Sequence, residues 1–334
     1  MDEKLFKQSW IIEPAGGKYL SPPVYRLVDT SDANTTTTKL FIVGFKPFQL
    51  PRRATEPSDT FKRKVAHLAK LLSYPGVSSQ GFRTLQCIGI VRYDITRGNK
   101  QIHQYGFVNE FPSHGGNVVH DFESLSTAIA SKTEIRPTLG ERFRLARALA
   151  ETLFNFHSVD WLHKSIRSDN ILLFRGMKSF NFSEPYLFGF EFSRAEGDQS
   201  TTDNDDSLIN NLYRHPRRQG LPDARFSILH DIYALGVVLL EVGIWRPLSG
   251  FDDFSSMAPD DIKNSLIEHA NVRLPHYMGQ DYADAVVKCL DGSLAGFLTT
   301  NEQDLAPSEE NRARILIAFW EGPFDLIEKG LAIK

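Results

Sequence analysis

The sequence has few cysteines and almost no excess charge. Its 334 residues include two cysteines, Cys87 and Cys289, which lie far apart in apolar surroundings. We expect both to be small buried hydrophobic residues in a reducing compartment, because two distant thiols do not form the framework of a disulfide-rich domain. The formal net charge is −3, so the chain lacks the basic field that holds nucleic acid. We therefore expect no nucleic acid among its partners.

A long apolar run is also missing. The first ten residues, MDEKLFKQSW, are charged and lack the apolar core of a signal peptide. The longest apolar run extends from Ile232 to Trp245, which is too short for a membrane span, and it contains Glu241. We therefore predict no membrane span and a cytoplasmic protein.

The first hundred residues are predicted to be mostly strand. Residues 39–48, 84–93 and 104–111 are rich in β-branched and aromatic side chains. Between them, apolar residues at helical spacing predict one helix over residues 61–72. The segment 112–117, PSHGGN, is rich in turn-forming residues and is the predicted boundary between two lobes.

The rest of the chain is predicted to be mostly helical. Thr138 and Glu141 have the spacing of a capping box, and apolar residues recur at helical spacing after them. The segment that begins at Asp231 is apolar on every side, which is typical of a fully buried helix. Residues 195–207 are polar, acidic and without periodicity, and predict an exposed loop. The fold class is thus α+β, with a small β-rich lobe (residues 1–111) and a larger helical lobe (residues 112–334), an arrangement that places a site in the cleft between lobes.

Residues 163–174, HKSIRSDNILLF, resemble the protein-kinase catalytic loop H-R-D-x-x-x-x-N and the strand after it. His163 and Asn170 match at the right separation. Lys164 stands where the family has Arg, and Ser165 stands where it has the catalytic Asp. Arg167 stands at the position of the family's phosphate-facing Lys.

Two further segments follow in the order that the kinase family has them. Residues 186–194, YLFGFEFSR, resemble the DFG segment, with Gly189 at the metal-binding Asp, Phe190 at the Phe and Glu191 at the Gly. Residues 213–217, YRHPR, resemble the end of the activation segment, and residues 231–248 resemble the buried helix after it, including Asp231 at its start. Several landmarks in one order make the resemblance to protein kinases specific.

The first lobe carries a fainter resemblance. Residues 43–46, VGFK, align with the family's V-A-I-K, which makes Lys46 the candidate for the phosphate-contacting lysine. The other candidates for a nucleotide pocket are Asn109, Glu110 and Asn170. No G-x-G-x-x-G precedes Lys46, and no acidic residue lies between Thr60 and Tyr93 to supply its partner. A surface lysine at a strand end is the alternative interpretation of Lys46.

Taken as a whole, the chain most resembles the fungal kinase-like domains that accompany HeLo domains in heterokaryon-incompatibility and cell-death proteins. The segments HKSIRSDN, GFE-SR, YRHP and DIY-LGVVLLE-G-WRPL carry this resemblance. It implies a pseudokinase that signals by binding a protein partner, in which His163 and Phe190 are core residues and Asp231 accepts hydrogen bonds from the backbone of the loop before it.

The substitutions predict a loss of chemistry. Ser165 is a poor proton acceptor near neutral pH, and Gly189 has no side chain to bind Mg²⁺. The remaining candidates for a metal are Asn170 and Glu191, and the nearby acids are Asp169 and Glu191. We therefore expect no required cofactor, weak binding of ATP and no dependence on Mg²⁺.

Three functions remain open at this point. The first is a signalling scaffold or switch without transferase activity. The second is an atypical protein kinase, or another kinase-fold phosphotransferase, that uses ATP. The third is a metal-independent nucleotide sensor. A regulatory site is expected in the acidic loop, at Ser200, Thr201, Thr202 and Ser207, with a solvated disordered loop as the alternative.

Overall fold

In the computed structural model the chain divides into two compact units. The first unit comprises residues 1–122 and 186–194, and the second comprises residues 123–185 and 195–334. The predicted lobes instead divide at residue 111, and they do not assign residues 186–194 to the first lobe. The structure describes residues 5–7, 10–14, 24–29, 40–48, 50, 56–74, 76, 81–98, 100–114, 117–132, 136–176, 179–190, 192–195, 208–220, 225–294 and 309–332.

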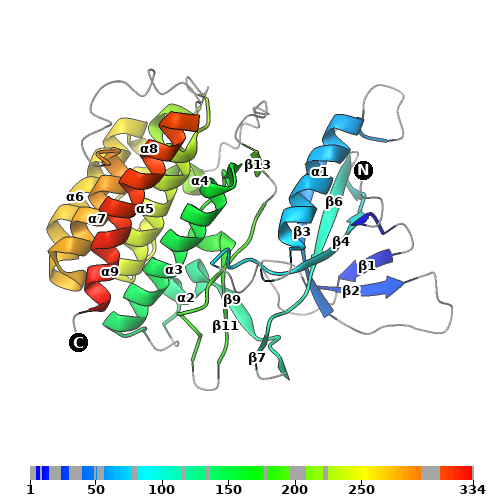
Figure 1. Ribbon diagram of the computed structural model, residues 1–334, viewed down its shortest axis with the longest axis horizontal. Coiled ribbons are helices and arrows are strands. Elements are labelled where there is room, and N and C mark those ends of the chain that lie inside the picture. The colour runs from blue at the N-terminus through cyan, green and yellow to red at the C-terminus, as the bar shows by residue number, and fades with distance from the viewer. Residues whose placement is uncertain are drawn as a thin grey trace. The chain divides into compact units, whose positions relative to one another are not determined.

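The first unit is built on an antiparallel sheet with the strand order β1-β2-β3-β6-β4, and β5 pairs with β6. Its elements, drawn in blue and cyan in Figure 1 apart from β12, are β1 (Trp10–Pro14), β2 (Val24–Asp29), β3 (Leu40–Phe48), α1 (Asp59–Leu72), β4 (Cys87–Arg92), β5 (Ile95–Arg97), β6 (Lys100–Asn109), β7 (Ser113–His114), β8 (Asn117–Val118) and β12 (Tyr186–Leu187).

The predicted strands and helix of this unit correspond to β3, β4, β6 and α1. Strand β6 begins at Lys100, earlier than the sequence pattern indicates, because the charged and polar residues before Gln104 pair with β5. The predicted break at residues 112–117 contains the short antiparallel pair β7 and β8. The segment therefore contains paired strand residues and not only a linker.

Strand β4 is also paired on the side away from β6. Phe6 forms a parallel bridge with Ile90, and the Lys7 N–H donates to the Ile90 carbonyl at 2.9 Å. The Phe6 ring packs edge-on against Tyr105 of β6, with 5.5 Å between ring centroids. Residues near the start of the chain thus lie beside β4, at the end of the sheet opposite to β1.

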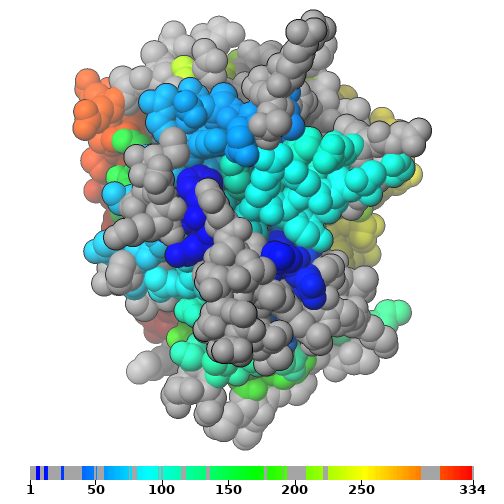
Figure 2. Space-filling view, turned by 90° about the vertical axis from the view of Figure 1, so that its right-hand side faces the viewer, coloured from blue at the N-terminus to red at the C-terminus, as the bar shows by residue number. Residues whose placement is uncertain are grey.

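Helix α1 covers part of this sheet. The Ser58 hydroxyl caps it by accepting a hydrogen bond from the Phe61 N–H at 3.2 Å. Its buried face is the predicted one, with Val65, Leu68 and Leu72 almost fully enclosed. The helix packs against β4, and Figure 2 shows α1 beside the cyan strand residues on the surface of this unit.

The second unit is mainly helical (Figure 1). Strands β9 (Phe122–Ser124) and β13 (Arg194–Ala195) lie at the boundaries of the two units. The other elements are α2 (Leu125–Ala130), α3 (Leu139–Ser158), β10 (Trp161–Leu162), η2 (Ser168–Asn170), β11 (Ile171–Phe174), α4 (Leu208–Leu212), η3 (Pro216–Arg218), α5 (Ile228–Ile244), η4 (Leu248–Gly250), η5 (Phe254–Ser256), α6 (Pro259–Met278), α7 (Gln280–Asp291), α8 (Glu309–Phe319), the π-helical turn η7 (Trp320–Phe324) and α9 (Asp325–Leu331).

Two predictions about these helices are confirmed. The capping box at the start of α3 is present, since the Thr138 N–H donates to the Glu141 carboxylate at 2.7 Å and the Glu141 N–H donates to the Thr138 hydroxyl at 3.3 Å. Helix α5 is buried along almost its whole length and packs against α3, α6 and α7. It is therefore the central element of this unit.

The coarse fold class is confirmed as mixed α+β, with a small antiparallel sheet and a larger helical part. Both cysteines are buried, as expected, and burial raises the pKa of the Cys87 thiol to about 12. Among the helices of the described residues, none is long and apolar enough to span a membrane.

Candidate functional site

The loop from His163 to Asn170 is anchored to the first turn of α5. The Asp231 carboxylate accepts the His163 N–H at Oδ2 and the Lys164 N–H at Oδ1, both at 2.8 Å. His157 Nε2 of α3 lies 3.3 Å from Oδ2. Asp231 has no exposed surface. The expectation that Asp231 is buried and accepts hydrogen bonds from the loop backbone is confirmed.

Within the loop, Ser165 and Asn170 hydrogen-bond to each other. The Asn170 side-chain amide donates to the Ser165 carbonyl at 2.9 Å and to the Ser165 hydroxyl at 3.0 Å. The Ser165 N–H donates to His163 Nδ1 at 3.3 Å, and His163 is fully buried. Within the described residues, no carboxylate hydrogen-bonds to Ser165. Contacts among its own residues therefore help to hold the shape of the loop.

The charged residues of the loop contact neighbouring elements of the second unit. Asp169 Oδ1 accepts the Ser126 hydroxyl of α2 at 2.7 Å. The Arg167 guanidinium donates to the Asn210 side-chain carbonyl of α4. Lys164 has a left-handed backbone, with φ of 68°, and its amine lies 5.6 Å from the centre of the Phe226 ring.

Ser168 connects the loop to the far end of α5. Its hydroxyl lies 2.8 Å from the Tyr213 hydroxyl, which donates to Glu241 Oε2 at 2.8 Å. The other oxygen, Oε1, accepts the Leu248 N–H at 3.1 Å. Burial raises the pKa of Glu241 to about 7, although both hydrogen bonds to its carboxylate lower it. The sequence pattern showed the buried helix but not this network, because no motif marks Tyr213 and Glu241 as partners.

The remaining candidates with described positions lie in the first unit. The Lys46 amine donates to the Ser193 carbonyl at 3.2 Å. Gly189 has φ of 79°, a backbone conformation that glycine adopts without steric cost. Phe190 is buried, as expected of a core residue. Lys46 and Gly189 thus belong to one unit, and the His163–Asn170 loop belongs to the other.

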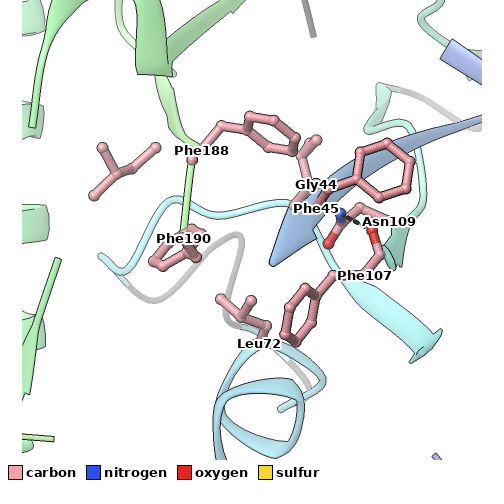
Figure 3. Close-up of a pocket in the computed structure, with 10 residues that line it drawn as sticks. Gly44, Phe45, Leu72, Phe107, Asn109, Phe188 and Phe190 are labelled. Atoms are coloured by element: carbon pink, nitrogen blue, oxygen red, sulfur yellow. Dashed lines mark hydrogen bonds between the residues drawn. The ribbon is translucent and has the colours of Figure 1, made fainter. Parts of the chain in front are cut away.

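A small apolar cavity lies in the first unit between β3, β6 and the segment that contains Gly189 (Figure 3). Its volume is about 10 Å³, which is close to the space that one water molecule needs. The Phe188 ring closes over Gly44, so that a Cβ at position 44 would lie 3.1 Å from the ring. The lining consists of Gly44, Phe45, Leu72, Leu85, Phe107, Asn109, Leu187, Phe188, Gly189 and Phe190.

Asn109 is part of this cavity, whereas Glu110 does not line it. The buried Asn109 amide donates to the carbonyls of Ile42 at 3.1 Å and Phe107 at 2.8 Å. The Glu110 N–H donates to the Gln86 carbonyl at 3.0 Å. Phe188 and Gly44 were not among the predicted site residues, although their position beside Gly189 and Lys46 in the sequence was a usable signal.

Several predicted residues lie outside the described part of the chain. These are Glu191, one of the two candidates for a metal ligand, and the loop residues Ser200, Thr201, Thr202 and Ser207. Among the described residues, no three His, Cys, Asp or Glu side chains lie together as a metal site requires. Asn170, the other candidate, donates its amide hydrogens to Ser165.

Residues 103–317 match a family model described as a domain of unknown function, DUF7580. The chain belongs to this family. No curated protein matches the chain. The DUF7580 match includes the His163–Asn170 loop, helix α5 and the segment of Gly189, whereas Lys46 and Gly44 lie before it. The region that defines the family therefore contains the loop and its anchor on α5.

Proposed function

We propose that this DUF7580 protein is a degenerate relative of the protein kinases that acts by binding a protein partner and not by phosphoryl transfer. The observation that carries the proposal is the pair formed by Ser165 and Asn170, which stand at the base and metal-ligand positions of the motif. They hydrogen-bond to each other at 2.9 Å and 3.0 Å. Such a pair maintains the shape of the loop and contains no carboxylate that could accept the proton of a substrate hydroxyl.

The chemistry of the substituted positions supports the same proposal. Loss of a general base costs about 10²–10⁴-fold in rate, or about 3–5 kcal/mol of barrier. Asp169, the acid in the same loop, is hydrogen-bonded to Ser126. Gly189 offers no carboxylate to a metal.

The cavity of the first unit supports weak nucleotide binding at most. Small-molecule sites usually have about 300–1,000 Å³ of space, whereas this cavity has about 10 Å³. A purine would have to displace Phe188, which lies against Gly44. We therefore expect ATP to bind weakly and without help from Mg²⁺.

The resemblance to HeLo-associated kinase-like domains gives this proposal its biological setting. In that setting the chain would be a scaffold or switch in fungal self/non-self recognition and cell death, and its partner would be a protein. The geometry of the Asp231 anchor supports a binding role, because a binding surface needs a stable loop even where no reaction occurs.

Two measurements test the proposal together. A radiolabel transfer assay is expected to show no phosphate on the protein or on generic substrates above a Lys46→Ala control. Thermal unfolding with ATP, with and without Mg²⁺, is expected to show a small shift that does not depend on the metal. Transfer that requires Lys46 would overturn the proposal. A rise of several degrees with Mg·ATP, absent with ATP alone, would instead identify a metal-dependent nucleotide site.

A further inference from the structure

Glu241 is a carboxyl group in the interior of the second unit. It is 2% exposed, and no Lys, Arg or His of the described residues forms an ion pair with it. Its oxygens have unequal partners, since Oε1 accepts a backbone N–H from Leu248 and Oε2 accepts the Tyr213 hydroxyl. A buried carboxylate without a cation is costly, and the addition of one proton removes its charge.

We propose that Glu241, Tyr213 and Ser168 form a proton-operated latch between α5 and the His163–Asn170 loop. The inference is independent of the proposed function, since it concerns the state of the loop and not what the protein binds. In the ionised state Glu241 can only accept hydrogen bonds. Tyr213 then donates to Glu241, and the Ser168 hydroxyl donates to Tyr213 across 2.8 Å.

Protonation reverses this order. Because Oε1 accepts the Leu248 N–H, the proton taken from solvent resides on Oε2, which becomes the donor to Tyr213. The Tyr213 hydroxyl hydrogen must then turn to Ser168, and Ser168 loses the acceptor for its own hydrogen. Ser168 has no exposed surface, and besides Tyr213 its hydroxyl also hydrogen-bonds to the Glu241 carboxyl. On protonation of Glu241 the Ser168 hydrogen therefore turns from Tyr213 to this carboxyl, and the hydrogen bonds that join the loop to α5 are rearranged.

The groups that act on the Glu241 carboxyl come from three segments around it. Tyr213 comes from the segment after α4, the Leu248 N–H comes from η4, and Ser168 and Asp169 come from the loop. Tyr213, the Leu248 N–H and Ser168 favour the ionised form of Glu241. Burial and the negative charge of Asp169 oppose it. Among the described residues of α3, α6 and α7, which pack against α5, none contributes a titratable group to this set. Opposed influences of this kind place the proton exchange near neutral pH.

The direct test is infrared difference spectroscopy between pH 5 and 9. We expect the C=O band of a buried protonated carboxylic acid to disappear with a midpoint near 7, and to be absent from the Glu241→Gln variant. Glu310→Gln, on the exposed surface of α8, is the matched control and should retain the band. A wild-type spectrum without such a titration would overturn the proposal.

Coupling to the loop is tested by hydrogen exchange of the amides from His163 to Asn170, corrected for intrinsic rates. Their protection is expected to change by about tenfold across the same pH range in the wild type, which corresponds to about 1.4 kcal/mol, and to stay constant in Glu241→Gln. Tyr213→Phe keeps the titrating carboxyl but removes the relay, so its loop amides should also lose the pH dependence. Loop protection that follows pH equally in wild type and Tyr213→Phe would contradict the latch, and this comparison remains valid if Glu241→Gln fails to fold.

Discussion

Two buried carboxylates lie on the same helix, and their surroundings differ. Asp231, in the first turn of α5, accepts two backbone N–H groups and lies beside His157. Glu241, in the last turns, accepts one phenol and one N–H. Negative charge is favoured at a helix N-terminus and disfavoured near the C-terminus. Burial alone therefore does not decide the role of a carboxylate: the first anchors the loop backbone, and the second is the group that we propose exchanges a proton.

The largest effect is expected from Asp231→Ala. The substitution leaves the buried His163 N–H and the half-buried Lys164 N–H without an acceptor, and a buried donor of this kind costs about 1–3 kcal/mol. Urea denaturation should therefore show a loss of several kcal/mol in the free energy of unfolding. Asp231→Asn, which retains one acceptor oxygen, should lose less. If Asp231→Ala left the free energy of unfolding unchanged, this carboxylate would not hold the loop. The alignment of the second unit with the kinase motifs would then lose support.

The second prediction concerns pH. The pKa of Glu241 is raised in the folded state from 4.5 to about 7, a difference that corresponds to about 3 kcal/mol. Because the folded state then binds the proton more tightly than the unfolded state, this contribution is fully present below pH 4.5 and is lost as the pH rises through 7. Denaturation midpoints of wild type and Glu241→Gln should diverge over that range, with the wild type losing stability at the higher pH. If the midpoints of the two proteins changed with pH in parallel, Glu241 would not be a group that gains a proton in this range, and it would not differ from Asp231 in this respect.

Tyr213→Phe should have a smaller effect, because it removes one hydrogen bond but retains the ring in the core. We expect a loss of about 1 kcal/mol in the free energy of unfolding near neutral pH. The Tyr213 hydroxyl lowers the pKa of Glu241, so its removal should raise that pKa further. Carbon-13 NMR of the labelled carboxyl group measures this shift. A pKa that falls would show that Tyr213 does not act as the donor.

The smallest effect is expected from Ser165→Ala. The Asn170 amide keeps the Ser165 carbonyl as an acceptor after the hydroxyl is removed, and a change at a half-exposed loop position usually stays within about 0.5 kcal/mol. The same urea titration, run beside Asp231→Ala, gives the comparison. A large loss for Ser165→Ala would mean that the loop depends on its own hydroxyl more than on its anchor.

Sequence reasoning predicted the part of this arrangement that follows from periodicity and motif spacing. The all-apolar pattern of α5, the capping box of α3 and the anchoring role of Asp231 each had a local signal. The Tyr213–Glu241 contact joins residues far apart in the chain and needed the structure, as did the position of Phe188 over Gly44. Residues 186–194 are assigned to the first unit by their contacts, and a linear pattern carries no information about such contacts.

The pairing of Phe6 and Lys7 with Ile90 has a practical consequence. Without these residues, the outer side of β4 would present unpaired N–H and C=O groups, which can pair with strands of another molecule. A protein shortened to begin at Trp10 should therefore be more prone to aggregation than the full chain, even though β1 and the rest of the sheet remain. Size-exclusion chromatography of both forms at increasing concentration would measure how far this short segment keeps the protein monodisperse.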